Sequence, residues 1–385
     1  MTRKLASIRR IKELLPITGA DRIELAIVDG WQVVVKKAEF KVGELAVYFE
    51  IDSFIPNHIA PFLTSEGKEP KEYNGVKGER LKTVKLRKQL SQGLLLPVEA
   101  MFGGQGRANF SEGDDVTEAL GIQKWEAPEE KAESTSQQAK KTRAFPYFLR
   151  KTDQERIQNY GHMVVKALEE EFEVTVKKDG SSITIFRVVP GSPYYEDAKH
   201  MVYGKTSLWQ RIKRVLSRKK DEPVYGICSR NTLLPLDGNS NFHKAAAGVL
   251  DALKDHADCV VNRSLAIQGE VVAPDIQGNY EQVEGVELHI FDIFEIDKQE
   301  YMLAPVRRVW VQEFGLKHVK VVDKGTLRNI LQLQEGDDVV KKCLTYASGP
   351  GDNPGVDREG VVFKAAYRDF SFKAVSNEYL LKTGK

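Results

Sequence analysis

A lysine followed two positions later by an aspartate and then a glycine is the strongest chemical signal in the sequence. In the segment VTVKKDGS, residues 174–181, Lys177 and Asp179 share one face of an expected strand because side chains alternate along a strand. Gly180 then ends the strand and lets the backbone approach a bulky group. A lysine amine can attack the α-phosphate of a nucleotide once burial and nearby cations depress its pKa, as we expect for Lys177. The aspartate can hold a metal hydration shell or a ribose hydroxyl.

This pattern also arises by chance in surface turns, so it needs independent support. Further short motifs follow it in order along the chain. They are CSRN at 228–231, QGEVV at 268–272, FDI at 291–293, REGVVFK at 358–364 and SFK at 371–373. Each motif also has a purely structural reading when it is taken alone. Phe291 can be a core residue, Glu359 can begin a simple turn, and Arg230 can form a surface ion pair.

Taken together and in this order, the motifs resemble those of the covalent nucleotidyltransferase superfamily, which contains RNA ligases, DNA ligases and mRNA capping enzymes. The resemblance covers residues 145–385 and includes motifs I, Ia, III, IV and V. The chain looks most like ATP-dependent RNA ligases with an N-terminal OB-fold domain, because a strand-rich region precedes the motifs and only ten residues follow Val375. The segment KTDQERIQN at 151–159 resembles the same group.

The resemblance implies a role for each conserved position of the family pattern. The catalytic residues it implies are Lys177, Asp179, Glu359 and Lys373. The residues implied to bind ATP are Lys177, Arg230, Glu270, Phe291 and Lys373. Among them Lys177 receives AMP, Phe291 stacks on adenine, and Lys373 contacts the α-phosphate. Arg230 neutralises phosphate charge or grips the ribose, and Glu270 binds the ribose. Asp179, Glu270 and Glu359 are implied to hold Mg²⁺ or Mn²⁺ through water.

Motif V departs from the family pattern, in which two lysines are separated by one residue. This chain has Lys373, Ala374 and Val375 at these positions. Either Lys373 acts alone, or Lys364 or Lys382 assists it. Strict alternation places Lys364 on the strand face opposite Glu359, which weakens its candidacy.

The motif residues must be positioned by a domain in which helices and strands alternate along the chain. We expect an OB-like β-barrel over residues 1–120, with a hairpin around Asp29 and Gly30, and a flexible linker over residues 121–143. Residues 144–385 are expected to form a nucleotidyltransferase domain, an ATP-grasp-like adenylyltransferase of α+β class with antiparallel sheets. Its helices are expected at 153–170, 241–256 and 305–314, and its strands at 173–188, 224–229, 265–272, 286–296, 360–364 and 370–375.

Two clusters of basic residues support contact with nucleic acid, although the net charge is only +2. The first comprises Arg80, Lys82, Lys85, Arg87 and Lys88, and we expect it to bind RNA. Alternation along a strand predicts that Lys85 and Arg87 share one face. The second comprises Arg211, Lys213, Arg214, Arg218, Lys219 and Lys220, beside Trp209. Such runs are more often solvated faces, so they support the interpretation only together with the motifs.

Composition limits the setting in which this chemistry takes place. Hydrophobic residues make up 41% of the chain, and no apolar run approaches the roughly 18 residues that a membrane span needs. The three cysteines are too far apart for a metal knuckle or a disulfide framework, which favours a reducing, cytoplasmic location. We expect a soluble monomer without membrane contact.

The predicted function is that of an ATP-dependent RNA ligase, which forms phosphoric ester bonds between a 3′-hydroxyl and a 5′-phosphate. The expected substrate is RNA or an RNA-containing duplex with a nick, and the expected intermediates are lysyl-AMP and an adenylylated 5′-phosphate strand. Two alternatives remain open from the sequence. One is another covalent nucleotidyltransferase, such as a DNA ligase or a capping enzyme, and the other is a catalytically inactive relative that binds nucleic acid.

Overall fold

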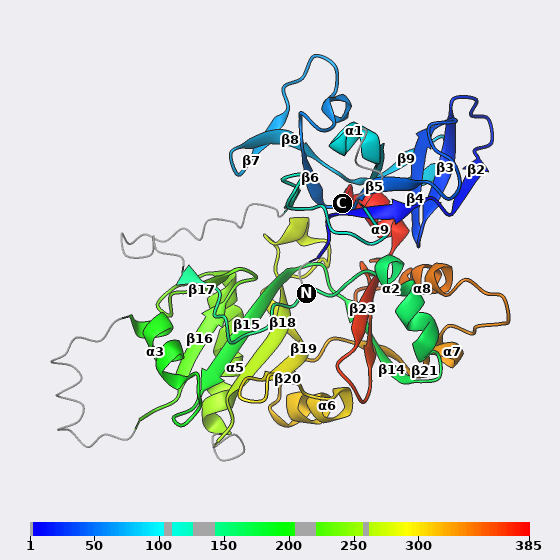
Figure 1. Ribbon diagram of the computed structural model, residues 1–385. Helices are drawn as coiled ribbons and strands as arrows, with labels where there is room; N and C mark the ends of the chain where they lie inside the picture. The colour runs from blue at the N-terminus through cyan, green and yellow to red at the C-terminus, as the bar shows by residue number, and fades with distance from the viewer. Residues whose placement is uncertain (1–2, 104–109, 126–142, 205–220, 257–261) are drawn as a thin grey trace.

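The computed structural model describes residues 3–103, 110–125, 143–204, 221–256 and 262–385. The second basic cluster and Trp209 lie outside these ranges. Figure 1 shows two parts of the molecule, with the N-terminal strands above and two further sheets below. All the ladders between named strands are antiparallel. The predicted α+β class with antiparallel sheets is therefore confirmed.

The described residues of the N-terminal domain form short strands, the 3₁₀ helix η1 (Pro61–Leu63) and one short α-helix. One sheet contains β1 (Ala6–Arg10), β5 (Leu45–Phe49) and β11 (Leu94–Pro97), and a second contains β2 (Glu13–Pro16), β3 (Ile23–Val28) and β4 (Trp31–Lys36). A third contains β12 (Gln123–Lys124), β6 (Ser53–Pro56), β8 (Val76–Arg80) and β7 (Lys71–Tyr73). Strands β9 (Thr83–Leu86) and β10 (Gln89–Gln92) form a hairpin, and α1 (Val98–Phe102) follows β11. The predicted hairpin at Asp29 and Gly30 is present between β3 and β4.

The N-terminal domain extends into the segment that the sequence analysis assigned to the linker. Strand β12 pairs with β6, and the Trp125 ring beyond it lies 4.7 Å from the Tyr73 ring and 6.0 Å from the Phe54 ring. An aromatic residue and a strand pairing thus fix residues 121–125 to the N-terminal sheet. Residues 126–142, the rest of the expected linker, lie outside the described ranges.

The C-terminal part contains a seven-stranded and a four-stranded sheet. The first has the order β13 (Arg143–Ala144), β17 (Thr232–Leu234), β16 (Val224–Cys228), β15 (Ser181–Val188), β18 (Leu265–Val272), β19 (Glu287–Glu295) and β20 (Glu300–Tyr301). The second has the order β21 (Val321–Thr326), β14 (Glu171–Lys177), β22 (Gly360–Ala365) and β23 (Ser371–Val375). Helices α5 (Asn241–Asp255) and α6 (Ala304–Glu313) share a core with the larger sheet, and α3 (Tyr195–Tyr203) belongs to a separate cluster on it.

Two expected elements are described more finely by the structure. The stretch of strand expected over 173–188, in which Gly180 was expected to end the first strand, forms two shorter strands in different sheets, β14 and β15, because the chain turns at Lys178–Gly180. A Cβ added to Gly180 would lie 2.3 Å from the Val271 carbonyl oxygen, so this turn excludes a side chain. The helix predicted over 153–170 is also shorter. Helix α2 (Ile157–Val164) is followed by a 3₁₀ turn (Val165–Ala167), and residues 153–156 are not helical but contact other segments.

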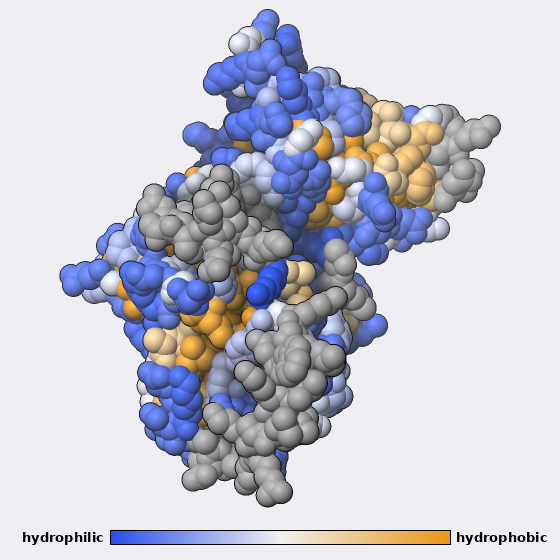
Figure 2. Space-filling view, turned by 90° about the vertical axis from the view of Figure 1, so that its left-hand side faces the viewer, coloured by the Kyte–Doolittle hydropathy of each residue, from blue (hydrophilic) through white to orange (hydrophobic). Residues whose placement is uncertain are grey.

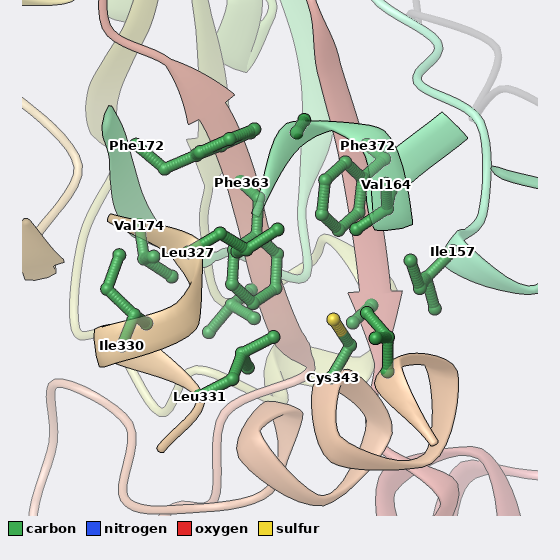
Figure 3. Close-up of a cluster of buried hydrophobic side chains, with 14 of the residues drawn as sticks. Ile157, Val164, Phe172, Val174, Leu327, Ile330, Leu331, Cys343, Phe363 and Phe372 are labelled. Atoms are coloured by element: carbon green, nitrogen blue, oxygen red, sulfur yellow. The ribbon is translucent and has the colours of Figure 1, made fainter. Parts of the chain in front are cut away.

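A hydrophobic core holds the four-stranded sheet against α2, α7 (Leu327–Ile330) and α8 (Val339–Ala347). Figure 3 shows aromatic and aliphatic side chains from strands and helices converging on this layer. Phe363 is fully buried, and its ring stacks on Phe372 at 4.8 Å between centroids. This core fixes strands β14, β22 and β23 relative to one another, and the ends of these strands carry the predicted site residues.

The two domains share a second core and a buried ionic network. Helix α9 (Asn377–Thr383) follows β23 and places Tyr379 and Leu380 in the N-terminal core beside Trp31. The Trp31 indole donates to Asn159 at 2.9 Å, and Asn159 donates to Glu50 at 3.1 Å. Glu50 is 2% exposed and also pairs with Arg3. The residues that continue past motif V therefore join the domains instead of forming a free tail.

The surface has an uneven distribution of polarity. In the view of Figure 2 hydrophilic side chains cover the top of the molecule, and apolar side chains gather in two areas, one toward the upper right and one in the lower half. Among the described residues, no helix combines the length and the apolar character needed to cross a membrane. Both described cysteines, Cys228 and Cys343, are free and buried.

Removing the Phe363 ring tests the role of the core beneath the four-stranded sheet. Phe363→Ala is expected to lower the free energy of unfolding by about 3–5 kcal/mol, because it creates a cavity in a fully buried cluster. Urea denaturation followed by circular dichroism measures this change. The control Tyr367→Ala truncates a side chain that is 70% exposed and should change the free energy by less than about 0.5 kcal/mol. Equal effects of the two variants would contradict the assignment of this core.

Candidate active site

Lys177 is the last residue of β14, and its amine points into a group of carboxylates. Its Nζ lies 2.7 Å from Glu359 Oε1, and its side chain is 25% exposed. Because Lys177 pairs with Gly360 across the β14–β22 ladder, Glu359 lies directly before the neighbouring strand. Glu270 on β18 and Asp179 in the turn after β14 also act on the Lys177 charge. The structure thus brings together four residues predicted from three separate motifs.

The pKa of Lys177 differs from the sequence-based expectation of a depressed value. Burial acts to lower the pKa, but the carboxylates of Glu359, Glu270 and Asp179 outweigh it and leave the pKa raised. The expectation was wrong for the protein without ligands, since the nearest groups are anions and not cations. The raised pKa keeps Lys177 protonated at neutral pH, and positive charge added at the carboxylates would lower that pKa.

The three carboxylates fit a hydrated divalent cation. Asp179 is 6% exposed, and its Oδ2 is buried without a hydrogen-bond partner, while Oδ1 accepts from Lys385 at 2.6 Å. Burial raises the pKa of Glu270 to about 7 and also raises that of Glu359, as expected for anions crowded together. Among the described residues, no three His, Cys, Asp or Glu side chains are grouped for direct metal binding. These residues suit an ion held through its water shell.

The turn that carries Asp179 is fixed by a buried ion pair that the sequence analysis missed. Lys178 is 2% exposed at its side chain and pairs with Glu281 at 2.7 Å and with Asp352 at 2.6 Å. Glu281 also accepts the Asp179 backbone N–H at 3.0 Å. Burial acts to lower the pKa of Lys178, but both carboxylates raise it and keep the residue charged. Lys178 therefore positions the turn, whereas its neighbour Lys177 faces the site.

A second group of charges contains Lys373 and Arg230. Both pair with Asp153, at 3.0 Å and 3.2 Å, and Lys124 of the N-terminal domain pairs with the same carboxylate. Burial lowers the pKa of Lys373 to about 8, although Asp153 opposes that change. Three cations on one carboxylate form a site suited to phosphate groups. Sequence reasoning missed Lys124 and Asp153, although Asp153 belongs to the quoted segment at 151–159.

Phe291 lies on a β-bulge that redirects its side chain. The pairing of β18 with β19 passes from Gln268–Asp292 to Gly269–Ile290, so Phe291 has no partner opposite it. Its side chain is half-buried, which leaves part of the ring accessible for stacking. Sequence alternation alone gave no signal of this bulge.

The two lysines considered as substitutes in motif V have other partners. Lys364 is buried, pairs with Asp292 at 2.6 Å and donates to the Phe291 carbonyl oxygen at 2.7 Å, so it supports the bulge. Lys382 lies 5.6 Å from the centre of the Tyr280 ring. Of the candidates, Lys373 alone joins the group around Asp153.

The first basic cluster lies on and beside the β9–β10 hairpin. Arg80 is directed inward, where it pairs with Asp52 at 2.5 Å and lies 5.9 Å from the centre of the Trp125 ring. Lys82, directly before β9, and Lys85 on β9 are exposed. Arg87 and Lys88 are exposed and form the two-residue turn, with φ of 49° and 68°. The prediction that Arg87 continues the strand alternation of Lys85 was therefore wrong, since the chain reverses at Arg87.

Comparison with known proteins identifies two matching family models. One describes an OB-fold domain and matches residues 5–98, and the other describes an RNA ligase and matches residues 170–375. A search of curated proteins finds no match.

Solved structures of Naegleria gruberi RNA ligase are similar along almost the whole chain. The structure with PPi is 38% identical, has a TM-score of 0.77, and the match covers 98% of this chain and 98% of that chain. A variant with AMP and Mn gives 38% identity, a TM-score of 0.77 and coverage of 98% of each chain. A variant with ATP and Mn gives 38% identity and a TM-score of 0.77, and covers 99% of this chain and 98% of that chain.

The raised pKa of Glu270 leads to a pH dependence of cation binding. Glu270 is neutral below about pH 7 and charged above it, so Mn²⁺ affinity should rise as pH increases through this range. Titration of the protein with Mn²⁺ between pH 6 and 8, followed by electron spin resonance of the free ion, measures this. Glu270→Gln has no titrating group and should bind more weakly with a flatter pH profile. An unchanged pH profile in that variant would assign the dependence to another residue.

Proposed function

The chain belongs to the RNA ligase family, and from this premise we propose that it joins RNA 3′-hydroxyl and 5′-phosphate ends in an ATP-dependent reaction. The proposed intermediate is AMP linked to Lys177, followed by an adenylylated 5′-phosphate strand. The observation that supports this most strongly is the position of the Lys177 amine, 2.7 Å from Glu359 beside two further carboxylates. The ATP, AMP and Mn in the related Naegleria gruberi structures support ATP and Mg²⁺ or Mn²⁺ as cofactors.

In the first reaction Lys177 Nζ attacks the α-phosphorus of ATP. An N–P bond forms, the bond from phosphorus to the bridging oxygen breaks, and pyrophosphate leaves with that electron pair. Asp179, Glu270 and Glu359 would hold a hydrated Mg²⁺ or Mn²⁺, whose positive charge offsets theirs and lets Lys177 lose its proton. The buried Asp179 Oδ2 without a partner supports this assignment.

The nucleotide is bound by residues on four different strands or their ends. Phe291, half-exposed on its bulge, stacks on adenine, and Glu270 accepts from the ribose hydroxyls. Lys373 and Arg230, which meet at Asp153, donate to the phosphates and offset the charge that develops during transfer. Their separation along the chain explains why the two sheets must be fixed before ATP can bind.

Two joining reactions complete the proposed sequence. A 5′-phosphate oxygen attacks the phosphorus of lysyl-AMP, the N–P bond breaks, and Lys177 recovers its amine. A 3′-hydroxyl then attacks the 5′-phosphorus of the adenylylated strand, and AMP leaves. A nicked duplex presents both ends side by side and is the proposed substrate, with the protein acting as a monomer.

The N-terminal OB-fold domain supplies the proposed contact with the RNA backbone. The exposed cations Lys85, Arg87 and Lys88 lie on the β9–β10 hairpin, and the exposed Lys82 directly precedes it. Val84 and Leu86 on the same hairpin are each 43% exposed, so the surface also offers apolar contacts to sugars or bases. Arg80 is excluded from this surface because its guanidinium pairs with Asp52.

Covalent labelling tests the proposed nucleophile. The purified protein incubated with α-labelled ATP and Mn²⁺ should retain the label after denaturation, because the phosphoramidate is covalent. Lys177→Ala should lose this label completely. Lys166→Ala, which removes an exposed lysine, should keep it. A label that persists in Lys177→Ala would reject this nucleophile, and the absence of label from the wild type with every nucleoside triphosphate would favour an inactive relative.

The salt dependence of RNA binding tests the hairpin. Replacing Lys85, Arg87 and Lys88 by alanine should reduce the slope of log affinity against log salt concentration by about 2 to 3, because each phosphate contact contributes about 0.7 to 0.9. Fluorescence anisotropy with a labelled nicked RNA measures the slope. The matched control replaces Lys36, Lys37 and Lys41, which are exposed and lie at or after the last residue of β4. This triple variant should leave the slope nearly unchanged. Equal losses in both triple variants would show that only net charge matters.

A further inference from the structure

We propose that Lys385 is a further residue of the active site, where its ammonium group neutralises Asp179 and competes with the divalent cation for that carboxylate. The inference rests on the proposed function in one respect, the assignment of the divalent cation to Asp179. It concerns a residue outside every motif that the sequence analysis identified.

Lys385 contacts the site directly. Its Nζ lies 2.6 Å from Asp179 Oδ1, and it donates a second hydrogen bond of 2.6 Å to the Tyr379 hydroxyl. The Asp179 side chain is 5% exposed, so this ion pair is largely shielded from water. The Lys385 charge also acts to lower the pKa of Glu359. One cation therefore affects two of the three carboxylates around Lys177.

The backbone holds Lys385 in this position. Gly384 adopts the left-handed conformation, with φ of 66°, and ends helix α9. The chain then turns back, so that the Lys385 N–H donates to the Leu380 carbonyl oxygen at 3.2 Å. Thr83 of the N-terminal domain donates its N–H to the Lys385 carbonyl oxygen at 3.2 Å. These contacts attach Lys385 to both α9 and strand β9, next to the proposed RNA-binding hairpin.

The partner of the Lys385 amine is itself fixed. Tyr379 is 1% exposed in the N-terminal core, and its ring meets the Tyr280 ring edge-on at 4.9 Å. The Tyr379 hydroxyl thus gives Lys385 a neutral second acceptor on a buried side chain. Two side-chain hydrogen bonds and two backbone hydrogen bonds therefore hold Lys385 beside Asp179.

A divalent cation that binds beside Asp179 has to act against this ammonium. The two positive charges repel one another, and the buried setting weakens the screening of that repulsion by solvent. Lys385 either withdraws from Asp179 when the cation binds or remains and reduces its affinity. In both cases the protein without ATP binds the cation more weakly than the carboxylates alone would.

Cation binding in the absence of ATP tests this inference. Lys385→Met removes the charge and keeps much of the side-chain volume, and we expect it to tighten Mn²⁺ binding about five- to tenfold. Lys382→Met is the matched control, because Lys382 lies in helix α9 near Lys385 and its amine is over the Tyr280 ring. It should bind Mn²⁺ as the wild type does, and Lys385→Arg should do so as well. Electron spin resonance of free Mn²⁺ gives the affinities, and the thermal midpoint with and without Mn²⁺ gives a second readout.

The outcomes separate this inference from the proposed function. Unchanged or weaker Mn²⁺ binding by Lys385→Met would contradict competition between Lys385 and the cation for Asp179, even if the wild type forms the lysyl-AMP adduct. Tighter binding in a protein that forms no adduct with ATP would support the competition and count against the ligase activity. Equal tightening by Lys382→Met would also overturn the inference, because the effect would then follow from net charge alone.

Discussion

The central physical constraint is an excess of buried negative charge around one amine. Asp179, Glu270 and Glu359 surround Lys177, and the ammonium groups of Lys177 and Lys385 cannot neutralise all three. The raised pKa values of Glu270 and Glu359 express this imbalance, as does the raised pKa of Lys177. Positive charge added at these carboxylates would lower the pKa of Lys177. In the proposed reaction, nucleophile activation therefore depends on the arrival of a cation, because the same carboxylates bind the cation and hold the proton on Lys177.

The fold provides this concentration of charge by placing the ends of strands from two sheets next to each other. The turn at Lys178–Gly180 passes directly from the four-stranded sheet to the seven-stranded sheet, and its tight packing against β18 excludes a side chain at Gly180. Glu281 fixes the turn from outside through Lys178 and the Asp179 N–H. The N-terminal domain completes the region, since Lys124 reaches Asp153 and α9 joins the N-terminal core.

Part of this site was predictable because its residues lie in short motifs with regular spacing. Lys177, Glu270 and Glu359 follow the family pattern, and strand β18 matches its predicted range of 265–272. Asp153, Lys124 and Lys385 were missed because their partners are distant in sequence. Lys373 and Asp153 are 220 positions apart, and Lys385 and Asp179 are 206 apart. No local pattern encodes such ion pairs, since they depend on how the domains pack. The bulge at Phe291 and the turn at Arg87 were missed for a different reason. The residue types around both positions fit the two-residue alternation of a regular strand, but the backbone does not continue as a regular strand there.

The central claim is that Lys177, and not its buried neighbour Lys178, receives AMP. The most direct measurement is mass spectrometry of peptides from the protein after incubation with ATP and Mn²⁺, under conditions that preserve the phosphoramidate. Fragmentation should place the added mass of one AMP on Lys177. Lys178 pairs with Glu281 and Asp352 and should remain unmodified. An AMP adduct on Lys178, or on a lysine outside the carboxylate group, would contradict the account.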